Sequence, residues 1–239
     1  MGKLIAIYGE AGAGKTTTAV NLACSLSKNN YTVSLVSANI EYGELQVFFN
    51  VFVDREHGVF AALNDQSDQQ QNRLALSGYQ NLFILTVPND GPDELGLTLG
   101  AVSIENVLNR IQLSSDFLIV DCKDDLCNEI TLMALYRSDN VICVHKPDNT
   151  GILWYSAHKD TLLSFDVTHI INDNIMFMEP DSFSREIGRK IDYYLPNVPF
   201  ASTLKNSGAP IYYDKSKASA KYAMEIDKLS TSMQGGYYG

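Results

Sequence analysis

Residues 9–16 decide the fold of this 239-residue chain, and they read Gly9-Glu10-Ala11-Gly12-Ala13-Gly14-Lys15-Thr16. The octapeptide satisfies the pattern G-x-x-x-x-G-K-[ST], which is typical of a loop that binds phosphate groups. Its glycines let backbone N–H groups turn inward toward phosphate oxygens. Lys15 supplies a positive charge for the β and γ phosphates, and the Thr16 hydroxyl offers a ligand to Mg²⁺. We therefore expect the octapeptide and Thr17 to bind ATP with Mg²⁺.

The segments around this loop alternate between two kinds of pattern. Apolar runs predict strands at residues 4–8, 32–37, 82–87, 117–120, 141–144, 167–171 and 198–201. Amphipathic patterns predict helices at residues 16–28, 103–113, 130–136, 153–163, 182–194 and 214–229. Strands that are continuously apolar are covered on both faces. The alternation therefore predicts an α/β fold with a doubly wound, mostly parallel sheet and helices on both faces.

Length and composition predict one domain. Hydrophobic residues make up 45% of the chain, which is enough for a sizeable core. No linker rich in proline, glycine or serine and no internal repeat divides it. We expect a single nucleotide-binding domain over residues 1–234 and a flexible tail over residues 235–239.

The charge and the cysteines restrict the environment and the partners. A net charge of −10 argues against broad, non-specific binding to nucleic acid. The four cysteines form no CxxC pair, so a disulfide framework is not expected and a reducing cytoplasm fits best. No apolar run approaches the length of a transmembrane segment, about 20 residues.

Beyond the phosphate loop, the chain resembles the MinD/ParA family of dimeric ATPases. The resemblance begins with residues 12–23, Gly-Ala-Gly-Lys-Thr-Thr-Thr-Ala-Val-Asn-Leu-Ala. Residues 37–40 stand where the family has Asp-x-Asp, and residues 81–88 and 117–121 resemble two of its strands. Pro199 and the turn at residues 208–210 resemble its closing segments. The resemblance implies a single α/β domain that forms a homodimer around ATP and acts as a switch on a protein partner.

Two positions depart from the family pattern. The second residue of the family's loop is a signature lysine that reaches across the dimer to the partner's nucleotide, and here it is Glu10. Two like charges about 4 Å apart repel by about 4 kcal/mol at a surface-like dielectric, so Glu10 has to point away, bind a cation or pair with a basic group. The aspartate that orients the attacking water aligns with Asn39, whose amide cannot accept a proton.

Three further residues are candidates for the site. Asp121 ends an expected strand, where a carboxylate can hold Mg²⁺ through water. Asn172 ends another, where family members often place an asparagine or arginine against adenine. Lys123 is a candidate replacement for the missing lysine charge, although a solvated switch loop is the ordinary interpretation. We assign the catalytic positions to Lys15, Asn39 and Asp121.

Other features receive ordinary interpretations. His145 also ends an expected strand, but no spacing of histidine, cysteine and aspartate here resembles a metal site, so we interpret it as a loop histidine. The C-terminal region is locally basic, which in DNA-partition members helps to hold DNA. Interleaved acidic residues favour a solvated helix face instead.

The sequence therefore predicts an ATP-binding dimeric switch with weak or absent hydrolysis. One alternative is a DNA-partition ATPase, which would require a basic face. Another is a P-loop phosphotransferase acting on a small substrate, or a tyrosine kinase resembling those with a tyrosine cluster in the tail, here Tyr237 and Tyr238. The departures at residues 37 and 39 weigh against that second alternative. The identity of the protein partner stays open.

Overall fold

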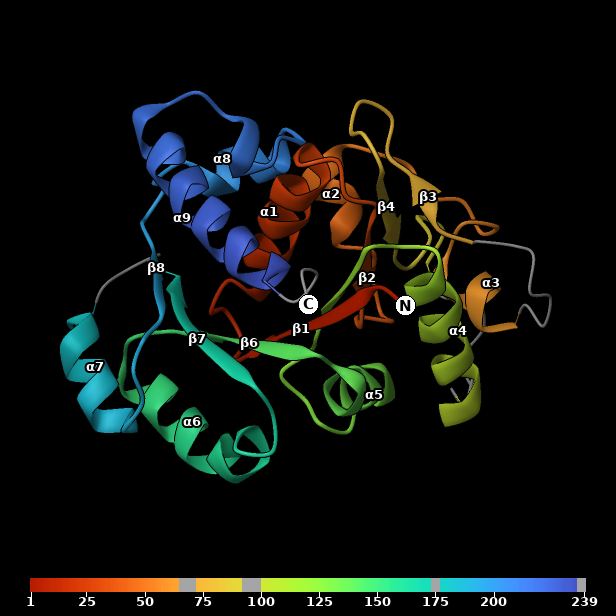
Figure 1. Cartoon of the computed structure of the whole chain (residues 1–239). Coiled ribbons are helices and arrows are strands. Elements are labelled where there is room, and N and C mark those ends of the chain that lie inside the picture. Colours follow the sequence, from red (N-terminus) through yellow and green to blue (C-terminus); the bar gives the residue numbers. More distant parts are fainter. Residues whose placement is uncertain (65–71, 92–99, 173–176, 236–239) are drawn as a thin grey trace.

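The central feature of the fold is one sheet with helices on both faces (Figure 1). The computed structural model describes residues 1–64, 72–91, 100–172 and 177–235. The predicted tail at residues 235–239 therefore lies outside the described residues, except for Gly235. The predicted α/β fold class, a doubly wound and mostly parallel sheet, is confirmed.

Eight strands form the sheet, in the order β3-β4-β2-β5-β1-β6-β7-β8. Their bounds are β1 Lys3–Gly9, β2 Val33–Ser37, β3 Leu74–Ala75, β4 Leu82–Leu85, β5 Phe117–Asp121, β6 Asn140–His145, β7 Val167–Asn172 and β8 Tyr193–Leu195. The short edge strand β3 pairs antiparallel with β4, and the other pairs within the described residues are parallel. Strand order reverses at β1, where α/β sheets bind ligands at their carboxyl edge.

The helices divide between the two faces of the sheet (Figure 1). One face carries α1 Lys15–Lys28, α2 Leu45–Phe49, α8 Ala201–Asn206, the 3₁₀ turn η1 Ile211–Tyr213 and α9 Lys217–Gln234. The other face carries α3 Val59–Asn64, α4 Ala101–Leu113, α5 Glu129–Arg137, α6 Asn149–Leu162 and α7 Pro180–Ile187. Crossovers between parallel strands are right-handed, so reversing the direction of strand addition moves the connecting helices to the opposite face.

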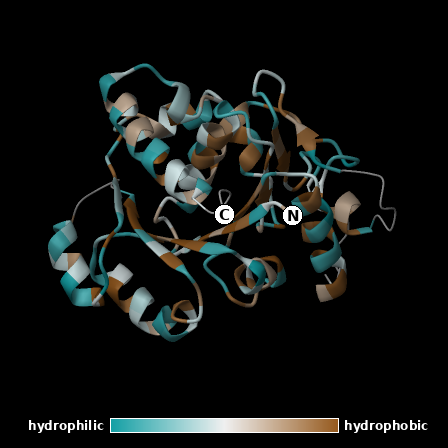
Figure 2. Ribbon diagram, in the orientation of Figure 1, coloured by the Kyte–Doolittle hydropathy of each residue, from teal (hydrophilic) through white to brown (hydrophobic). Residues whose placement is uncertain are grey.

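The core consists of two apolar layers, one on each side of the sheet. Side chains alternate along a strand, so β1 sends Ile5 and Ile7 into the layer under α1 and Leu4, Ala6 and Tyr8 into the layer under α5. Figure 2 shows the strands as mostly hydrophobic and the outer surfaces of the helices as mostly hydrophilic. Among the described residues, no helix has both the length and the apolar character that crossing a bilayer requires.

The segment after β7 differs from the sequence prediction. The helix expected at residues 182–194 ends at Ile187, because Gly188 adopts a left-handed conformation with φ 65° and stops it. The expected strand at residues 198–201 was wrong. The last strand is β8, which pairs with β7 through Ile170 and Tyr193, while residue 201 begins α8.

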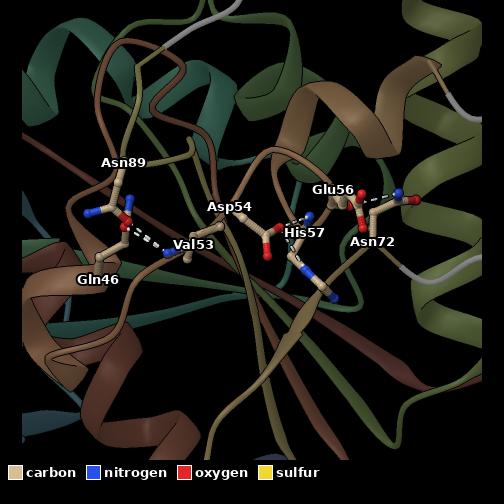
Figure 3. A network of polar contacts seen from close by, with 7 residues as sticks. All are labelled: Gln46, Val53, Asp54, Glu56, His57, Asn72 and Asn89. Carbon is tan, nitrogen blue, oxygen red and sulfur yellow. Dashed lines mark hydrogen bonds and ion pairs between the residues drawn. The ribbon is translucent and has the colours of Figure 1, made fainter.

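The short elements α2, α3, α8 and β3 were not predicted, because each is too short to show a period. Side chains and backbone hold the region of α2 and α3 together (Figure 3). The backbone N–H of Val53 donates to Oε1 of Gln46 at 3.2 Å and to Oδ1 of Asn89 at 2.7 Å, and Asn72 donates to the carbonyl of Glu56. These contacts tie the chain after α2 to the loop that follows β4.

Candidate nucleotide-binding site

The phosphate loop connects the end of β1 to the start of α1, at the carboxyl edge of the sheet. Gly9, Gly12 and Gly14 all have positive φ, at 154°, 76° and 92°, which side chains rarely permit. The Lys15 ammonium folds over the loop and donates to the carbonyls of Gly9 at 3.0 Å and Glu10 at 2.8 Å. Burial lowers the pKa of Lys15. The loop thus holds the positive charge of Lys15 where the phosphates of a nucleotide would bind.

Gly9 leaves no space for a side chain, which allows a matched test. A Cβ there would lie 2.2 Å from the carbonyl oxygen of Val144 in β6, whereas a Cβ at Gly12 would meet nothing within 4 Å. We expect Gly9→Ala to lower the free energy of unfolding by about 3 kcal/mol or more, because strain and a backbone clash add. Gly12→Ala introduces backbone strain but no clash, so it should lower the free energy of unfolding by about 1–2 kcal/mol. Urea unfolding measures both, and equal losses would contradict the clash.

Thr16 and Asp121 meet beside the loop. The Thr16 hydroxyl donates to Oδ2 of Asp121 at 2.8 Å. Asp121 is only 7% exposed, and its Oδ1 has no hydrogen-bond partner among the described residues. Burial raises the pKa of this carboxyl to about 7. A buried carboxylate oxygen without a partner, next to a hydroxyl, fits a hard cation such as Mg²⁺.

A cavity of about 370 Å³ opens over these groups. Eight residues that the sequence singled out line it, namely Gly12, Gly14, Lys15, Thr16, Thr17, Asn39, Asp121 and Lys123. Four further residues complete the lining: Tyr42, Glu44, Cys122 and Asp124. Ligand pockets in proteins have volumes of this order. The fold therefore brings together the loop after β1, the start of α1 and the segments at the ends of β2 and β5.

The side chain of Glu10 turns away from this cavity. Its Oε1 accepts a hydrogen bond from the backbone N–H of Lys146 at 3.1 Å, and the side chain is only 4% exposed. A Cβ on Gly151 would lie 2.6 Å from the same oxygen, so the carboxylate is enclosed by the start of α6. Burial raises the pKa of Glu10, and the Lys146 hydrogen bond opposes that rise. Glu10 thus anchors the loop to the segment after β6.

The two asparagines take different places. Asn39 lines the cavity, but its Oδ1 already accepts from the backbone N–H of Glu41 at 2.9 Å. Asn172, the last residue of β7, is 5% exposed and lies against the loop, with its Nδ2 3.4 Å from the carbonyl of Gly14. It does not line the cavity, and its predicted contact with adenine stays a prediction.

Charged groups at the rim are paired with one another. Lys123 forms an ion pair with Glu41 at 3.0 Å, so its charge is already compensated. Glu44 forms an ion pair with Lys205. The sequence did not indicate Glu44 as a residue of the site, because the helix α2 that follows it is too short to recognise. A second cavity, of about 420 Å³, shares Thr17 with the first and is lined by residues around Asn197, Pro199 and Lys205.

These features define a P-loop nucleotide-binding protein. They are a parallel strand, a glycine loop closed by a lysine, a helix and a neighbouring strand that ends in an aspartate. Residues 2–155 match the AAA domain family. The chain belongs to the MinD/ParA family of P-loop ATPases, as the resemblance predicted.

Individual relatives agree with this assignment. The chain is 23% identical to the iron-sulfur cluster carrier protein of Pyrococcus horikoshii, over 97% of this chain and 86% of that protein. It is 31% identical to the sporulation initiation inhibitor protein Soj of Bacillus subtilis, over 59% of this chain and 57% of Soj. The septum site-determining protein MinD of P. horikoshii, complexed with Mg-ADP, superposes with a TM-score of 0.75 at 18% identity, covering 99% of this chain and 98% of MinD. That last likeness shows the fold.

Proposed function

We propose that this protein is an ATP- and Mg²⁺-dependent switch of the MinD/ParA type that turns ATP over slowly or not at all. The cavity over Lys15, Thr16 and Asp121 supports binding of a Mg-nucleotide, and the fold is that of a MinD complexed with Mg-ADP. MinD is a septum site-determining protein, which supports a role in positioning another cellular machine. The triphosphate occupies the first cavity, and the base occupies the second, which shares Thr17 with it.

The orientation of Glu10 carries the proposal of slow turnover. A residue buried against Lys146 and Gly151 does not reach across to a partner's nucleotide, and its charge is opposite to that of the family's lysine. Asn39 faces the cavity with an amide in place of a carboxylate. The charge that stabilises the transition state and the group that activates water are therefore both missing from the positions where the family has them.

Phosphate release from the purified protein tests this proposal. We expect at most about one turnover per minute, far below the roughly 10 s⁻¹ of a median enzyme. Lys15→Ala serves as the background control for contaminating ATPases. The double variant Glu10→Lys with Asn39→Asp should release phosphate at least about 10-fold faster, because both missing groups return. A wild-type rate well above one per minute would refute slow turnover.

A dimeric ATP state is the second expected consequence. Because the nucleotide is cleaved slowly, a homodimer formed around ATP should persist long enough to be isolated. Light scattering after size exclusion should show a monomer without nucleotide and a dimer with ATP and Mg²⁺. Lys15→Ala should stay monomeric under both conditions. An unchanged mass for the wild-type protein would count against the switch.

The alternatives receive less support. Of the C-terminal lysines, Lys205 pairs with Glu44 and Lys228 with Glu225, so part of the positive charge that DNA partition requires is compensated. The asparagine at residue 39 weighs against a phosphotransferase, which would need a base near the γ-phosphate. The tail tyrosines Tyr237 and Tyr238 lie outside the described residues.

A further inference from the structure

Three potential metal ligands converge on the face of the sheet opposite α1. Cys143 and His145 lie two residues apart on β6, so their side chains leave the same face. His169 lies on β7, directly beside Cys143 in the strand register. All three residues are buried, at 0%, 1% and 8% exposure. On this face α6 and α7 cover β6 and β7 (Figure 1). The three residues do not line the nucleotide cavity.

The ligand atoms of the three residues are close together. One sulfur and two ring nitrogens lie within 4.8 Å of one another. Nε2 of His145 and Nδ1 of His169 are 2.9 Å apart and share one hydrogen bond. Tyr155 and Phe183 pack against the His145 ring, with centroids 5.6 and 5.5 Å away. These aromatic rings pack against the imidazole and hold it in place.

His145 has an unsatisfied polar atom at this point. Its Nδ1 is buried and has no hydrogen-bond partner among the described residues. Such atoms are uncommon in folded proteins and call for an explanation such as an absent ion.

A third cavity reaches one member of the cluster, His169. It has a volume of about 300 Å³ and is lined by His169 together with Tyr155, Arg189 and Asp192. The backbone N–H of His169 donates to Oδ2 of Asp192 at 2.9 Å, which holds this part of β7 against the chain before β8. An ion can thus reach His169 from the cavity, and a water molecule there can complete its coordination.

We propose that Cys143, His145 and His169 form a binding site for a transition-metal ion of the zinc class. One thiolate and two imidazoles are donors that Zn²⁺ and Co²⁺ accept, whereas Mg²⁺ prefers oxygen. On binding, the ion replaces the proton of the Cys143 thiol, which passes to solvent. The ion would bind one ring nitrogen of each histidine. Where that nitrogen donates the hydrogen bond between the two rings, its proton moves to the other nitrogen of the same ring. The site joins β6 to β7 and is separate from the Mg²⁺ site at Asp121.

Cobalt titration of the full-length, EDTA-stripped protein tests the proposal. We expect one equivalent of Co²⁺ to bind and to produce a thiolate-to-cobalt charge-transfer band together with visible d–d bands of a tetrahedral ion. Zn²⁺ should displace the cobalt. At a free Zn²⁺ concentration of 100 times Kd, the melting temperature should rise by about 5–10 °C.

Variants identify the ligands. Cys143→Ser should lose the charge-transfer band, and His169→Gln, at the edge of the cavity, should weaken Co²⁺ binding by about 10-fold or more. Cys24→Ser, which changes a buried thiol in α1, and Cys127→Ser, which changes an exposed thiol, should leave the spectrum unchanged. Binding of Mg-ATP by each variant shows that it is folded.

Three outcomes would overturn the site. The first is the absence of a charge-transfer band when stoichiometric Co²⁺ is added to the wild-type protein. The second is a folded Cys143→Ser protein that keeps the band. The third is loss of the band in Cys127→Ser, which would place the ion on the surface. The wild-type titration needs no substitution, so it tests the site even if one variant folds poorly. His169→Gln provides a second variant if Cys143→Ser does not fold.

Discussion

Lys15→Ala is expected to weaken the binding of Mg-ATP by about 100-fold or more. The Lys15 ammonium lies over the phosphate loop and donates to two loop carbonyls, so it lies where the β and γ phosphates would bind. Removing one partner of a charge-assisted contact in a partly buried site costs about 3 kcal/mol, which corresponds to that change in affinity. Isothermal titration calorimetry with ATP and Mg²⁺ measures it directly.

Lys28→Ala is the matched control for this substitution. Lys28 ends the same helix that Lys15 begins, and its side chain is exposed. It should bind Mg-ATP with wild-type affinity. Lys123→Ala tests the replacement hypothesis, and we expect only a small change because Lys123 is paired with Glu41. A Lys15→Ala protein that binds Mg-ATP normally would place the nucleotide elsewhere.

Asp121→Asn is expected to make the nucleotide-free protein more stable at pH 8 while abolishing the Mg²⁺ dependence of ATP binding. Burial raises the pKa of Asp121 from 3.8 to about 7, so the folded state holds this proton more tightly than the unfolded state. The bound proton contributes to the free energy of unfolding at acidic pH. That contribution is lost as pH rises from about 4 to about 7, by up to about 1.4 kcal/mol per pH unit. An amide avoids that loss, and we expect a gain of about 1–3 kcal/mol at pH 8.

Urea unfolding at pH 5 and pH 8, without nucleotide or Mg²⁺, measures this difference. The gain from Asp121→Asn should shrink at pH 5, where the wild-type carboxyl is largely protonated. Asp160→Asn, at an exposed position of α6, should change stability little at either pH. If Asp121→Asn is less stable than the wild type at pH 8, the ionised Asp121 carboxylate does not destabilise the nucleotide-free protein.

The sequence was a reliable guide where function resides in consecutive residues. Gly9 to Thr16 form the phosphate loop through their own backbone and a single helix start, so local order is enough to recognise them. The same holds for the long strands β1, β5, β6 and β7, whose apolar runs predicted their burial on both faces. Asp121 could be placed because the ends of parallel strands meet at one edge of the sheet.

Prediction was weaker where one short element depends on another. The end of α7 is set by Gly188, and β8 exists because β7 offers an unpaired edge to Tyr193 and its neighbours. A stretch of three residues has no detectable period, so the strand was predicted several residues too late. The helix α2, which begins directly after Glu44 at the nucleotide cavity, was missed for the same reason.

By itself, the sequence determined the phosphate loop, the α/β class and the family. Only the tertiary structure decided what the departures from the family pattern do. Glu10 points into the fold because the backbone of Lys146, 136 residues away, offers it a hydrogen bond. His145, interpreted as a loop histidine, is a buried strand residue beside Cys143 and His169. Those contacts arise from strand pairing, and spacing along the chain does not encode which strands become neighbours.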